Sequence, residues 1–292
     1  MSEFSTFSYT EHNLPPLPSR PERSHKGSFG RVLCVCGSEG MCGAAYLAAH
    51  AAYRVGAGLV RILTPKENRA ILQTLLPEAL VTVYDASSPD PTVIQDAADW
   101  ADVLVIGCGM GISHASRSIL SDLLRSCDKP KILDADALNL LARNPSLLKH
   151  ARGSILTPHA MEMSRLSGKS VEEILEDPEA VAYEFAKKHG VICVLKDHET
   201  VVSDGSALLY RNNTGNSGMA TGGSGDVLSG VLGGLLAEAN GASRNLFVLA
   251  TLGVYLHGLA GDLMVEELTE YSLMARDLVD GLPLAIKRVT QA

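Results

Sequence analysis

The order of apolar and polar positions along the chain predicts short strands that alternate with helices. Apolar runs rich in Val, Ile and Leu end at Gly, Pro or Asp, which is typical of buried strands that feed loops. We also expect a hairpin around Asp204-Gly205, formed by Val201–Val202 and Leu208–Leu209. The predicted strands are Val32–Cys36, Leu59–Leu63, Leu80–Val83, Val103–Ile106, Lys131–Leu133, Ser154–Leu156 and Val191–Leu195.

Helical periodicity fills the intervals between these strands. The predicted helices are Gly43–Val55, Val93–Ala98, Ile119–Leu124, much of Val171–Lys188 and the whole chain from Asp226 onward. Strands separated by helices favour right-handed crossovers and a mostly parallel sheet that helices cover on both faces. We therefore predict an α/β fold with three layers, α/β/α, and a single domain over residues 25–292. A Pro-rich leader, residues 1–24, precedes it and lacks the apolar segment of a signal peptide.

Composition and charge exclude several classes of function. The chain has 292 residues and a net charge of −8, which argues against a broad surface for nucleic acid or anionic membrane, because both need clustered Lys and Arg. No uninterrupted apolar run reaches the ~18 residues that a membrane span needs. The six cysteines lie mostly in apolar stretches without paired CxxC units, which favours buried thiols in a reducing compartment. We expect a cytoplasmic protein with neither a nucleic-acid nor a membrane partner.

Polar or glycine-rich loops follow the apolar ends of five predicted strands. In a parallel α/β sheet these loops gather at the carboxyl edge of the sheet, where ligands bind. The pattern therefore indicates a binding site at this edge. The loops are Gly37, Gly107–Gly111, Asp134–Asp136, Thr157–His159 and Lys196.

A glycine-rich run, Thr221 to Asp226, opens directly into an apolar helical pattern. Free N–H groups at a helix start, together with the helix dipole, bind anions. The run is neither a Walker A loop, which needs Gly-Lys-Ser/Thr, nor a dinucleotide fingerprint, which follows a strand directly. We expect an anion hole built from the backbone of Gly222, Gly223, Ser224 and Gly225.

The carboxylate of Asp226 has two interpretations. It either caps the helix or acts as a base that faces the bound anion. The second suits phosphoryl transfer, in which backbone donors hold the charge and a carboxylate accepts the proton of an attacking hydroxyl. We expect the helix N-terminus to keep Asp226 ionised and to limit its basicity.

Taken in order, these motifs resemble those of the ADP/ATP-dependent NAD(P)H-hydrate dehydratases, a ribokinase-like family that repairs hydrated nicotinamide cofactors. The resemblance covers nearly the whole chain from His25 onward and implies a ribokinase-like catalytic domain. It also implies a hydro-lyase reaction, in which ADP or ATP phosphorylates the ring hydroxyl of hydrated NADH or NADPH and phosphate then leaves. The matching residues are His25-Lys26-Gly27-Ser28-Phe29-Gly30, Gly43-Ala44-Ala45, Gly56-Ala57-Gly58-Leu59-Val60, Gly107-Cys108-Gly109-Met110-Gly111, Asp134-Ala135-Asp136, Leu156-Thr157-Pro158-His159, Leu195-Lys196 with Thr200, Asn213 to Asp226, and Tyr255-Leu256-His257-Gly258.

The resemblance assigns roles to single residues. It implies that Asp226 is the catalytic base and a substrate contact. It also implies that Mg²⁺ accompanies the nucleotide. The protein ligands of this ion are unassigned, but Glu162 is a candidate to act through water. A separate NAD(P)H-hydrate epimerase is an expected functional partner because the leader is too short to hold one, and a homo-oligomer is expected. The implied contacts to the hydrated cofactor are Ala44, Gly109 and His159. The implied nucleotide contacts are Lys196, Asp197, His198, Glu199, Thr200 and Gly225.

Several positions depart from the family pattern or allow a purely structural interpretation. Met161 and Asp197 stand where the family has Gly, and we expect both to weaken substrate affinity; Cys42 and Cys108 replace prolines. His159, Asp134 and Asp136 could instead cap helices, and His257 could simply pack in the core. Two other functions stay open: a small-molecule hydroxyl kinase of the same fold, acting on a vitamin-precursor or sugar alcohol, and a nucleotide-binding regulator without catalysis.

Overall fold

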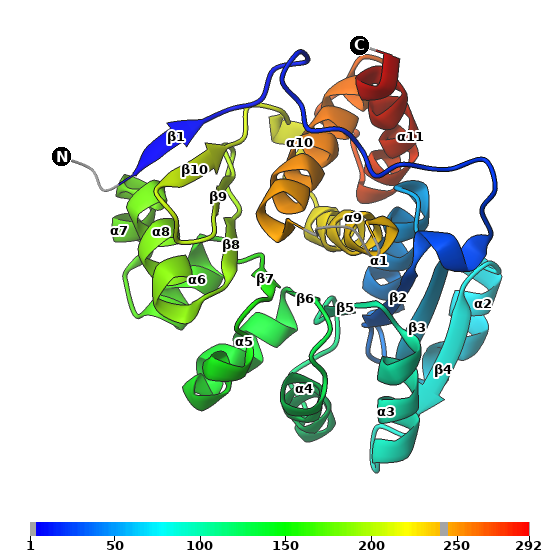
Figure 1. The fold of residues 1–292 in the computed structure, drawn as a ribbon. Coiled ribbons are helices and arrows are strands. Elements are labelled where there is room, and N and C mark those ends of the chain that lie inside the picture. The colour runs from blue at the N-terminus through cyan, green and yellow to red at the C-terminus, as the bar shows by residue number, and fades with distance from the viewer. Residues whose placement is uncertain (1–3, 240–244, 292) are drawn as a thin grey trace.

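The computed structural model describes residues 4–239 and 245–291, and Figure 1 shows its layers. Ten strands form one sheet in the order β1-β10-β9-β8-β7-β6-β5-β2-β3-β4. Strands β2 to β8 pair in parallel, whereas β9 is antiparallel to both β8 and β10. The strands are β1 Ser5–Phe7, β2 Arg31–Val35, β3 Leu59–Pro65, β4 Leu80–Tyr84, β5 Val103–Ile106, β6 Lys131–Leu133, β7 Ile155–Leu156, β8 Ile192–Leu195, β9 Val201–Ser203 and β10 Leu208–Arg211.

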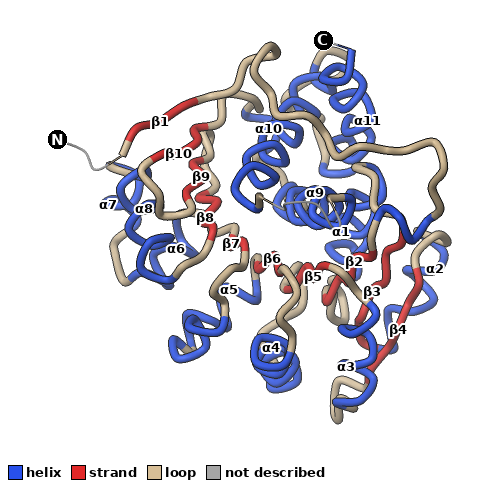
Figure 2. The backbone as a smooth tube through the Cα atoms, viewed as in Figure 1, coloured by secondary structure: helices blue, strands red, loops and turns tan. Residues whose placement is uncertain are grey.

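Helices cover both faces of the sheet, which confirms the predicted α/β/α layers (Figures 1 and 2). One layer holds α1 Cys42–Arg54, α2 Arg69–Leu75, α9 Ser224–Glu238, α10 Leu246–Val265 and α11 Ala275–Gln291. The other holds α3 Pro91–Trp100, α4 His114–Ser126, α5 Asp136–Arg143, α6 Ala160–Ser167, α7 Val171–Glu176 and α8 Pro178–His189. Short 3-10 turns lie at Lys26–Phe29, Lys66–Asn68, Pro145–His150 and Ser217–Met219.

The central strands are apolar throughout because neither face meets water. In β2, Leu33 and Val35 pack with the layer that contains α3 and α4. Val32 and Cys34, one residue out of phase, pack with α1 and α9 on the opposite face. Alternate side chains of a strand point to opposite faces, so both sets must be hydrophobic in a doubly covered sheet.

The direction of winding reverses between β2 and β5. From β2 the chain runs through α1 to β3, on to β4, and returns through α3 to β5 on the other side of β2. The loops after β2 and β5 meet there, where the N–H of Gly37 donates to the carbonyl of Cys108 at 2.8 Å. A crevice opens outside the carboxyl ends of the strands at such a reversal, and ligands bind in it.

Helix α9 lies close against α1 because its buried positions are small. A Cβ on Gly230 would lie 2.1 Å from the carbonyl oxygen of Ala48, and one on Gly234 would lie 2.6 Å from that of Ala52. Gly233 likewise faces Val105 of the sheet. These glycines let α9 pack between α1, α10 and the sheet, so it is covered within the chain rather than left for another subunit.

The leader contributes a strand that the sequence analysis does not predict. Strand β1 pairs in parallel with β10, with Phe7 opposite Tyr210. Tyr9 is buried, its ring centroid lies 4.8 Å from that of Tyr210, and its hydroxyl is 2.9 Å from the hydroxyl oxygen of Thr251. The described part of the leader therefore extends the sheet at its edge.

Two expectations about the C-terminal third need correction. The segment from Asp226 onward is not continuously helical, because turns occupy residues 266–274 before α11 begins. The second expectation is that no segment is long and apolar enough to span a membrane. Helix α10 meets that test by length and composition. Glycine and polar residues within it do not lower its hydropathy enough to exclude this. Two thirds of its most apolar segment is buried, and α10 packs mainly on α9 and α11, as the core helix of a globular domain does.

Candidate functional site

The carboxyl ends of β6 and β8 bring Asp134 and Lys196 to the start of α9, where Asp226 lies. Asp134, directly after β6, has a side chain only 1% exposed, and it accepts a 2.8 Å bond from the ammonium of Lys196 at the end of β8. Its second oxygen accepts from the hydroxyl of Ser229 at 2.8 Å. Burial opposes ionisation of Asp134. The charge of Lys196 and the hydroxyls of Thr157 and Ser229 outweigh burial and lower the pKa of the carboxyl.

Asp226 lies beside this ion pair. Ligand atoms of Asp226, Asp134 and Cys108 all lie within 4.8 Å of one another. Burial and the neighbouring charge of Asp134 raise the pKa of Asp226 to about 6, although Cys108 and Lys196 lower it. The expectation that the helix N-terminus limits its basicity is therefore wrong, because desolvation and like charge dominate. A carboxylate with this pKa is mostly ionised at pH 7 and more basic than an ordinary aspartate.

The start of α9 shows that Asp226 does not cap this helix. The N-cap is Gly223 at φ 96°, and no side chain caps this helix. Asp226 occupies the first turn with its carboxylate uncommitted to capping. Within the described residues, no recorded hydrogen bond uses the N–H groups of Gly222, Gly225 or Asp226, whereas the N–H of Ser224 donates to the carbonyl of Thr221 at 3.3 Å. The N–H of Gly223 likewise has no hydrogen bond among the described residues, so four free donors and the helix dipole can hold an anion here.

Gly225 connects this turn to the ion pair. A Cβ at Gly225 would lie 3.2 Å from the ammonium nitrogen of Lys196 and 3.7 Å from Oδ2 of Asp134. Any larger residue would press on the buried pair. The anion-binding turn, the lysine and Asp226 thus form one compact group.

His159 and Glu162 form a second pair of polar groups next to Lys196. The chain pairs His159 with Lys196 in an isolated parallel bridge. Nδ1 of His159 accepts the N–H groups of Met161 and Glu162, so the helix-capping interpretation of His159 is confirmed. Nε2 of His159 stays half exposed, 3.6 Å from Oε1 of Glu162, and capping does not prevent it from meeting a ligand.

Glu162 is 5% exposed and carries a perturbed carboxyl group. Its Oε2 accepts the backbone N–H of His159 at 3.0 Å. Burial raises the pKa of Glu162 to about 7, partly offset by Lys196. A buried carboxyl group with a pKa near neutrality is typical of functional sites.

Two of the predicted substrate contacts, Ala44 and Gly109, lie against each other. Gly109 has a φ of 59°, and a Cβ there would meet the Cβ of Ala44 at 2.8 Å and the carbonyl of Met41 at 3.0 Å. Helix α1 and the loop after β5 therefore meet at the switch point with no space for a larger residue. His159, the third predicted contact, lies across the ion pair on the β7 side.

The predicted nucleotide segment divides into one inward and several outward side chains. Lys196 points to Asp134, while His198 is 82% exposed. Asp197 accepts the N–H of His198, and Glu199 pairs with Arg211 of β10. Thr200 is buried and donates to the carbonyl of Asp197 at 3.2 Å, which fixes this short connection to β9.

The backbone between the two strand-end aspartates is strained. Ala135 has a φ of 47°, and it is the only non-glycine residue with a positive φ in the described part of the chain. Asp136 accepts the N–H of Gly111 at 2.8 Å and so ties the loop after β6 to the loop after β5. Neither aspartate caps α5. Strain of this kind clusters at functional sites.

The sequence alone leaves the role of Asp134 open between helix capping and a function in the site. Its motifs do not point to Ser229. A usable signal for Ser229 was present, because it lies three residues after Asp226 and shares its face of an apolar helix. His257 is buried, bonds the carbonyl of Ser224 at 3.1 Å and has a pKa lowered to about 4 by burial, so the core interpretation holds. It fixes the first turn of α9 from behind.

The departures from the family pattern lie in different surroundings. Met161 is 47% exposed in the first turn of α6. Cys108 is fully buried, and its thiol lies 3.9 Å from Asp134. Asp197 lies at the surface beside His198. The expected loss of substrate affinity at Met161 and Asp197 stays a prediction.

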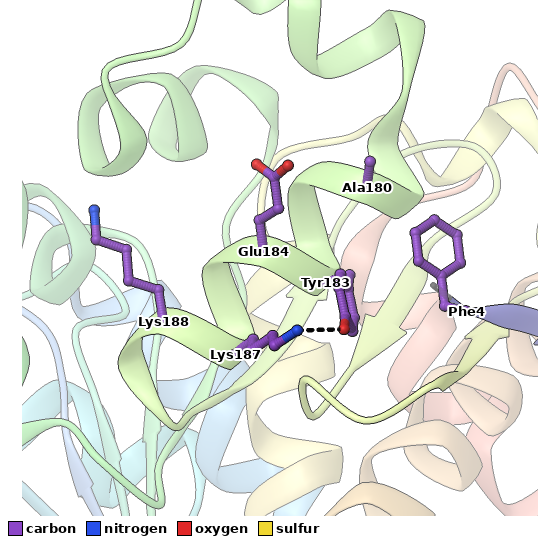
Figure 3. A pocket seen from close by; sticks show the side chains of 6 residues that line it. All are labelled: Phe4, Ala180, Tyr183, Glu184, Lys187 and Lys188. Atoms are coloured by element: carbon purple, nitrogen blue, oxygen red, sulfur yellow. Dashed lines mark hydrogen bonds between the residues drawn. The ribbon is translucent and has the colours of Figure 1, made fainter. Parts of the chain in front are cut away.

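Two cavities of similar volume lie in different parts of the described structure. One of about 490 Å³ lies at the carboxyl ends of β2 to β5 and includes Met110 and Gly111, next to Gly109. The other, of about 500 Å³, lies on α8 beside Phe4 of the leader (Figure 3). Lys187 there donates to the hydroxyl of Tyr183 at 2.8 Å. No predicted site residue lines either cavity, but the first contains Met110 and Gly111, which follow Gly109 in the loop after β5, so it is the one that lies beside the site.

The fold and these groups define a class of protein: an α/β protein with an anion-binding helix start and a basic carboxylate at the carboxyl edge of a mostly parallel sheet. Comparison with known proteins narrows this class. A family model described as NAD(P)H-hydrate dehydratase matches residues 32–284. The chain belongs to this family, and the resemblance drawn from its motifs is confirmed.

Individual relatives agree with the family. An ADP-dependent (S)-NAD(P)H-hydrate dehydratase of Neisseria meningitidis is 38% identical over 258 residues, which cover 85% of this chain and 81% of that protein. The chain spans about half the length of the curated bifunctional NAD(P)H-hydrate repair enzymes that it matches.

Solved structures confirm the ribokinase-like fold. A ribokinase-like superfamily protein of Enterococcus faecalis superposes with a TM-score of 0.86 at 29% identity and covers 98% of this chain and 97% of its own. An ADP/ATP-dependent NAD(P)H-hydrate dehydratase from Bacillus subtilis, co-crystallized with ATP/Mg²⁺, has a TM-score of 0.79 at 30% identity, with 94% of each chain covered.

Proposed function

We propose that this protein restores NADH or NADPH from its hydrate, with ADP or ATP as the phosphoryl donor. The observation that carries the proposal is the basic, uncommitted carboxylate of Asp226 at a helix start with free N–H donors. The family membership supports it over the kinase and the regulator, because relatives of this length are named dehydratases. Under this proposal the predicted site residues keep their roles.

The chemistry follows from the poor leaving ability of hydroxide. The oxygen of the ring hydroxyl attacks the terminal phosphorus of ADP or ATP while Asp226 accepts the proton of that hydroxyl. AMP or ADP is the leaving group. The C–O bond then breaks with the electron pair on phosphate, and loss of a ring proton restores the double bond of the dihydronicotinamide. The N–H groups of Gly222 and Gly225 hold the charge of the moving phosphoryl group.

The ion pair of Lys196 and Asp134 sets the charge around the transferred group. The carboxylates of Asp134 and Glu162 raise the pKa of Lys196 even though burial opposes this, so its ammonium stays charged. A cation fixed beside Gly225 attracts the nucleotide phosphates. Because Asp134 is held by Lys196 and Ser229, it neutralises this lysine and does not compete with Asp226 for the proton.

The residues present fit a Mg²⁺ ion carried by the nucleotide. Mg²⁺ prefers oxygen ligands and keeps several waters when it binds phosphates, so the thiol of Cys108 is unsuited to it. Asp134 is already satisfied by Lys196 and Ser229. The buried Glu162, acting through water, would hold the ion, and Asp226 stays available as the base. When bound, Mg²⁺ offsets the charge of the phosphates.

The proposal is tested with purified protein, hydrated NADH, Mg²⁺ and either ADP or ATP. Recovery of NADH absorbance together with release of phosphate is the expected result, and the two nucleotides are compared at equal concentration. Phosphorylation of a vitamin-precursor alcohol without recovery of NADH would favour the kinase instead. Nucleotide binding without turnover would favour the regulator.

Several further expectations stay proposals. We keep residues 25–292 as the catalytic domain, with a cytoplasmic location and a functional link to an NAD(P)H-hydrate epimerase. Relatives named as bifunctional repair enzymes, about twice as long, support that link. The homo-oligomer stays a prediction, since the burial of α9 within the chain removes one reason to expect it.

A further inference from the structure

The cavity beside Gly109 is formed by the loops that follow four neighbouring strands. Ser38 and Glu39 come from the loop after β2, and Pro65 and Glu67 from the end of β3. The rest of the lining comes from residues 84–87 after β4 and from residues 110–116 at the start of α4. Its volume of about 490 Å³ lies within the usual range for small-molecule sites, and it is large enough for a nucleoside.

The order of the strands decides which part of the substrate this cavity faces. On the proposed function, the donor nucleotide lies at Lys196 and Thr200, near β8 and β9, and the reacting hydroxyl lies at Asp226. The cavity lies in the opposite direction, past β5 and β2 toward β4. The half of the dinucleotide that does not react must extend away from the donor. The cavity is the space that the sheet offers it.

The lining carries negative charge. Glu39, Glu67 and Asp85 all face the cavity, and no Lys, Arg or His is among the described residues that line it. Lys66 is the one cation recorded beside them, and it pairs with Asp85 at 2.6 Å. Glu39 and Glu67 are exposed and have no recorded ion pair among the described residues. In the described part of the chain neither carboxylate is in an ion pair, and Lys66, which neighbours Glu67, is bound to Asp85.

These charges treat the two forms of the cofactor differently. A ribose with a free 2′-hydroxyl can donate a hydrogen bond to a carboxylate, as in dinucleotide sites that select NAD. A 2′-phosphate instead brings about two negative charges and no donor, and like charges brought together oppose binding.

We infer that this cavity binds the adenosine half of the substrate and selects hydrated NADH over hydrated NADPH. The inference rests on the proposed function for its chemistry and adds a substrate preference to it. It concerns the residues outside the reacting centre, so it does not alter the role of Asp226.

The test compares kcat/KM for the two hydrates with the nucleotide donor and Mg²⁺ held constant. At low salt we expect a preference of about tenfold or more for hydrated NADH, mainly through KM, because like-charge contacts weaken binding. The preference should shrink as salt is raised from about 0.05 to 0.5 M, since screening shortens the range of the repulsion. A preference that does not depend on salt would contradict an electrostatic origin.

Charge-reversal variants locate the effect. Glu67→Lys and Glu39→Lys should each raise kcat/KM for hydrated NADPH relative to hydrated NADH, by about fivefold or more. Both side chains are exposed, so folding should be unaffected. Glu176→Lys, at the exposed end of α7, introduces the same charge away from the cavity and should leave the ratio unchanged.

The outcomes separate this inference from the proposed function. Equal efficiency with both hydrates would overturn the preference while leaving the dehydratase intact. If neither hydrate is turned over, the proposed function fails, and the affinities for NADH and NADPH, measured by calorimetry, decide the inference instead. Tighter binding of NADPH than of NADH would then refute it.

Discussion

At the scale of single residues, Asp226 shows how burial sets chemistry. Its pKa of about 6 lies above the ordinary value of 3.8 because the carboxyl is desolvated and faces Asp134. The group must be ionised to accept a proton. We expect kcat/KM to rise with pH through about pH 6 and to level above it, falling about tenfold per unit on the acid side. A pH profile with no inflection between pH 5 and 7 would contradict this assignment.

Replacing Asp226 by Asn removes the base and keeps the shape of the side chain. We expect kcat to fall by about 10²–10⁴-fold, the usual contribution of a general base. The affinity for ADP should change little, because the N–H groups and Lys196 that hold phosphate are retained. Turnover is followed by NADH absorbance and binding by calorimetry, with the exposed Asp96→Asn as control. Full activity of Asp226→Asn would exclude the carboxylate as the base.

The same variant should be more stable than the parent protein. The folded pKa of Asp226 lies above the unfolded value, so the folded state binds the proton more tightly. Ionisation therefore costs folding free energy as pH rises from about 4 to 6. At pH 8 Asp226→Asn should gain about 1–3 kcal/mol in the free energy of unfolding, and at pH 4 little. Urea denaturation at both pH values measures the difference, and a gain that is equal at both would rule out this cause.

Removing one partner of the ion pair of Lys196 and Asp134 should instead lower the free energy of unfolding. Lys196→Met leaves the buried Asp134 carboxylate without its partner, and we expect a loss of about 3–5 kcal/mol in unfolding free energy. The double variant with Asp134→Asn should regain much of this, because no unpaired charge remains. The control is Lys149→Met, an exposed lysine. If the double variant is no more stable than Lys196→Met, the burial argument fails.

At the scale of elements, periodicity predicted strands β2 to β10 within about two residues. It placed the helices less well, because α4 begins at His114 rather than Ile119 and no ranges were predicted for α2, α5 and α6. Lys131–Leu133 matches β6, and Gly43–Val55 matches α1 to one residue at each end. The pattern works because the central strands are apolar on both faces and polar or glycine-rich loops follow them. It failed for β1, because Ser5–Phe7 is short and has no apolar run. This strand pairs with β10, and its Phe7 packs on Tyr210.

The contact between α1 and α9 depends on the absence of a side chain. Gly230→Ala would place a Cβ against the backbone of Ala48, where neither helix can yield easily. We expect a loss of about 1–3 kcal/mol or more from overpacking, measured by urea denaturation. Gly43→Ala, in α1 with open space around its Cβ, should be neutral or stabilise by up to about 1 kcal/mol. Equal effects of the two changes would contradict the close-packing argument.

At the scale of the whole molecule, the leader belongs to the fold and should contribute to its stability. Tyr9 is 7% exposed, packs on Tyr210 and bonds Thr251, so Tyr9→Ala should cost about 3–5 kcal/mol. Tyr271→Ala is the matched control, because that tyrosine is fully exposed and should have almost no effect. A Tyr9→Ala protein as stable as the control would show that the leader merely rests on the surface.

The layered fold, the family and the residues at the strand ends could be read from local patterns and motifs. Periodicity reports burial directly, and a glycine-rich helix start has the same donors in any fold. The chemistry of the site could not be predicted in this way. Whether Asp226 caps a helix or stays free, and that its pKa is raised to about 6, depend on Asp134 and Lys196, which lie 92 and 30 residues away in sequence. Burial and charge depend on distances in space, and only the packing of the sheet sets these.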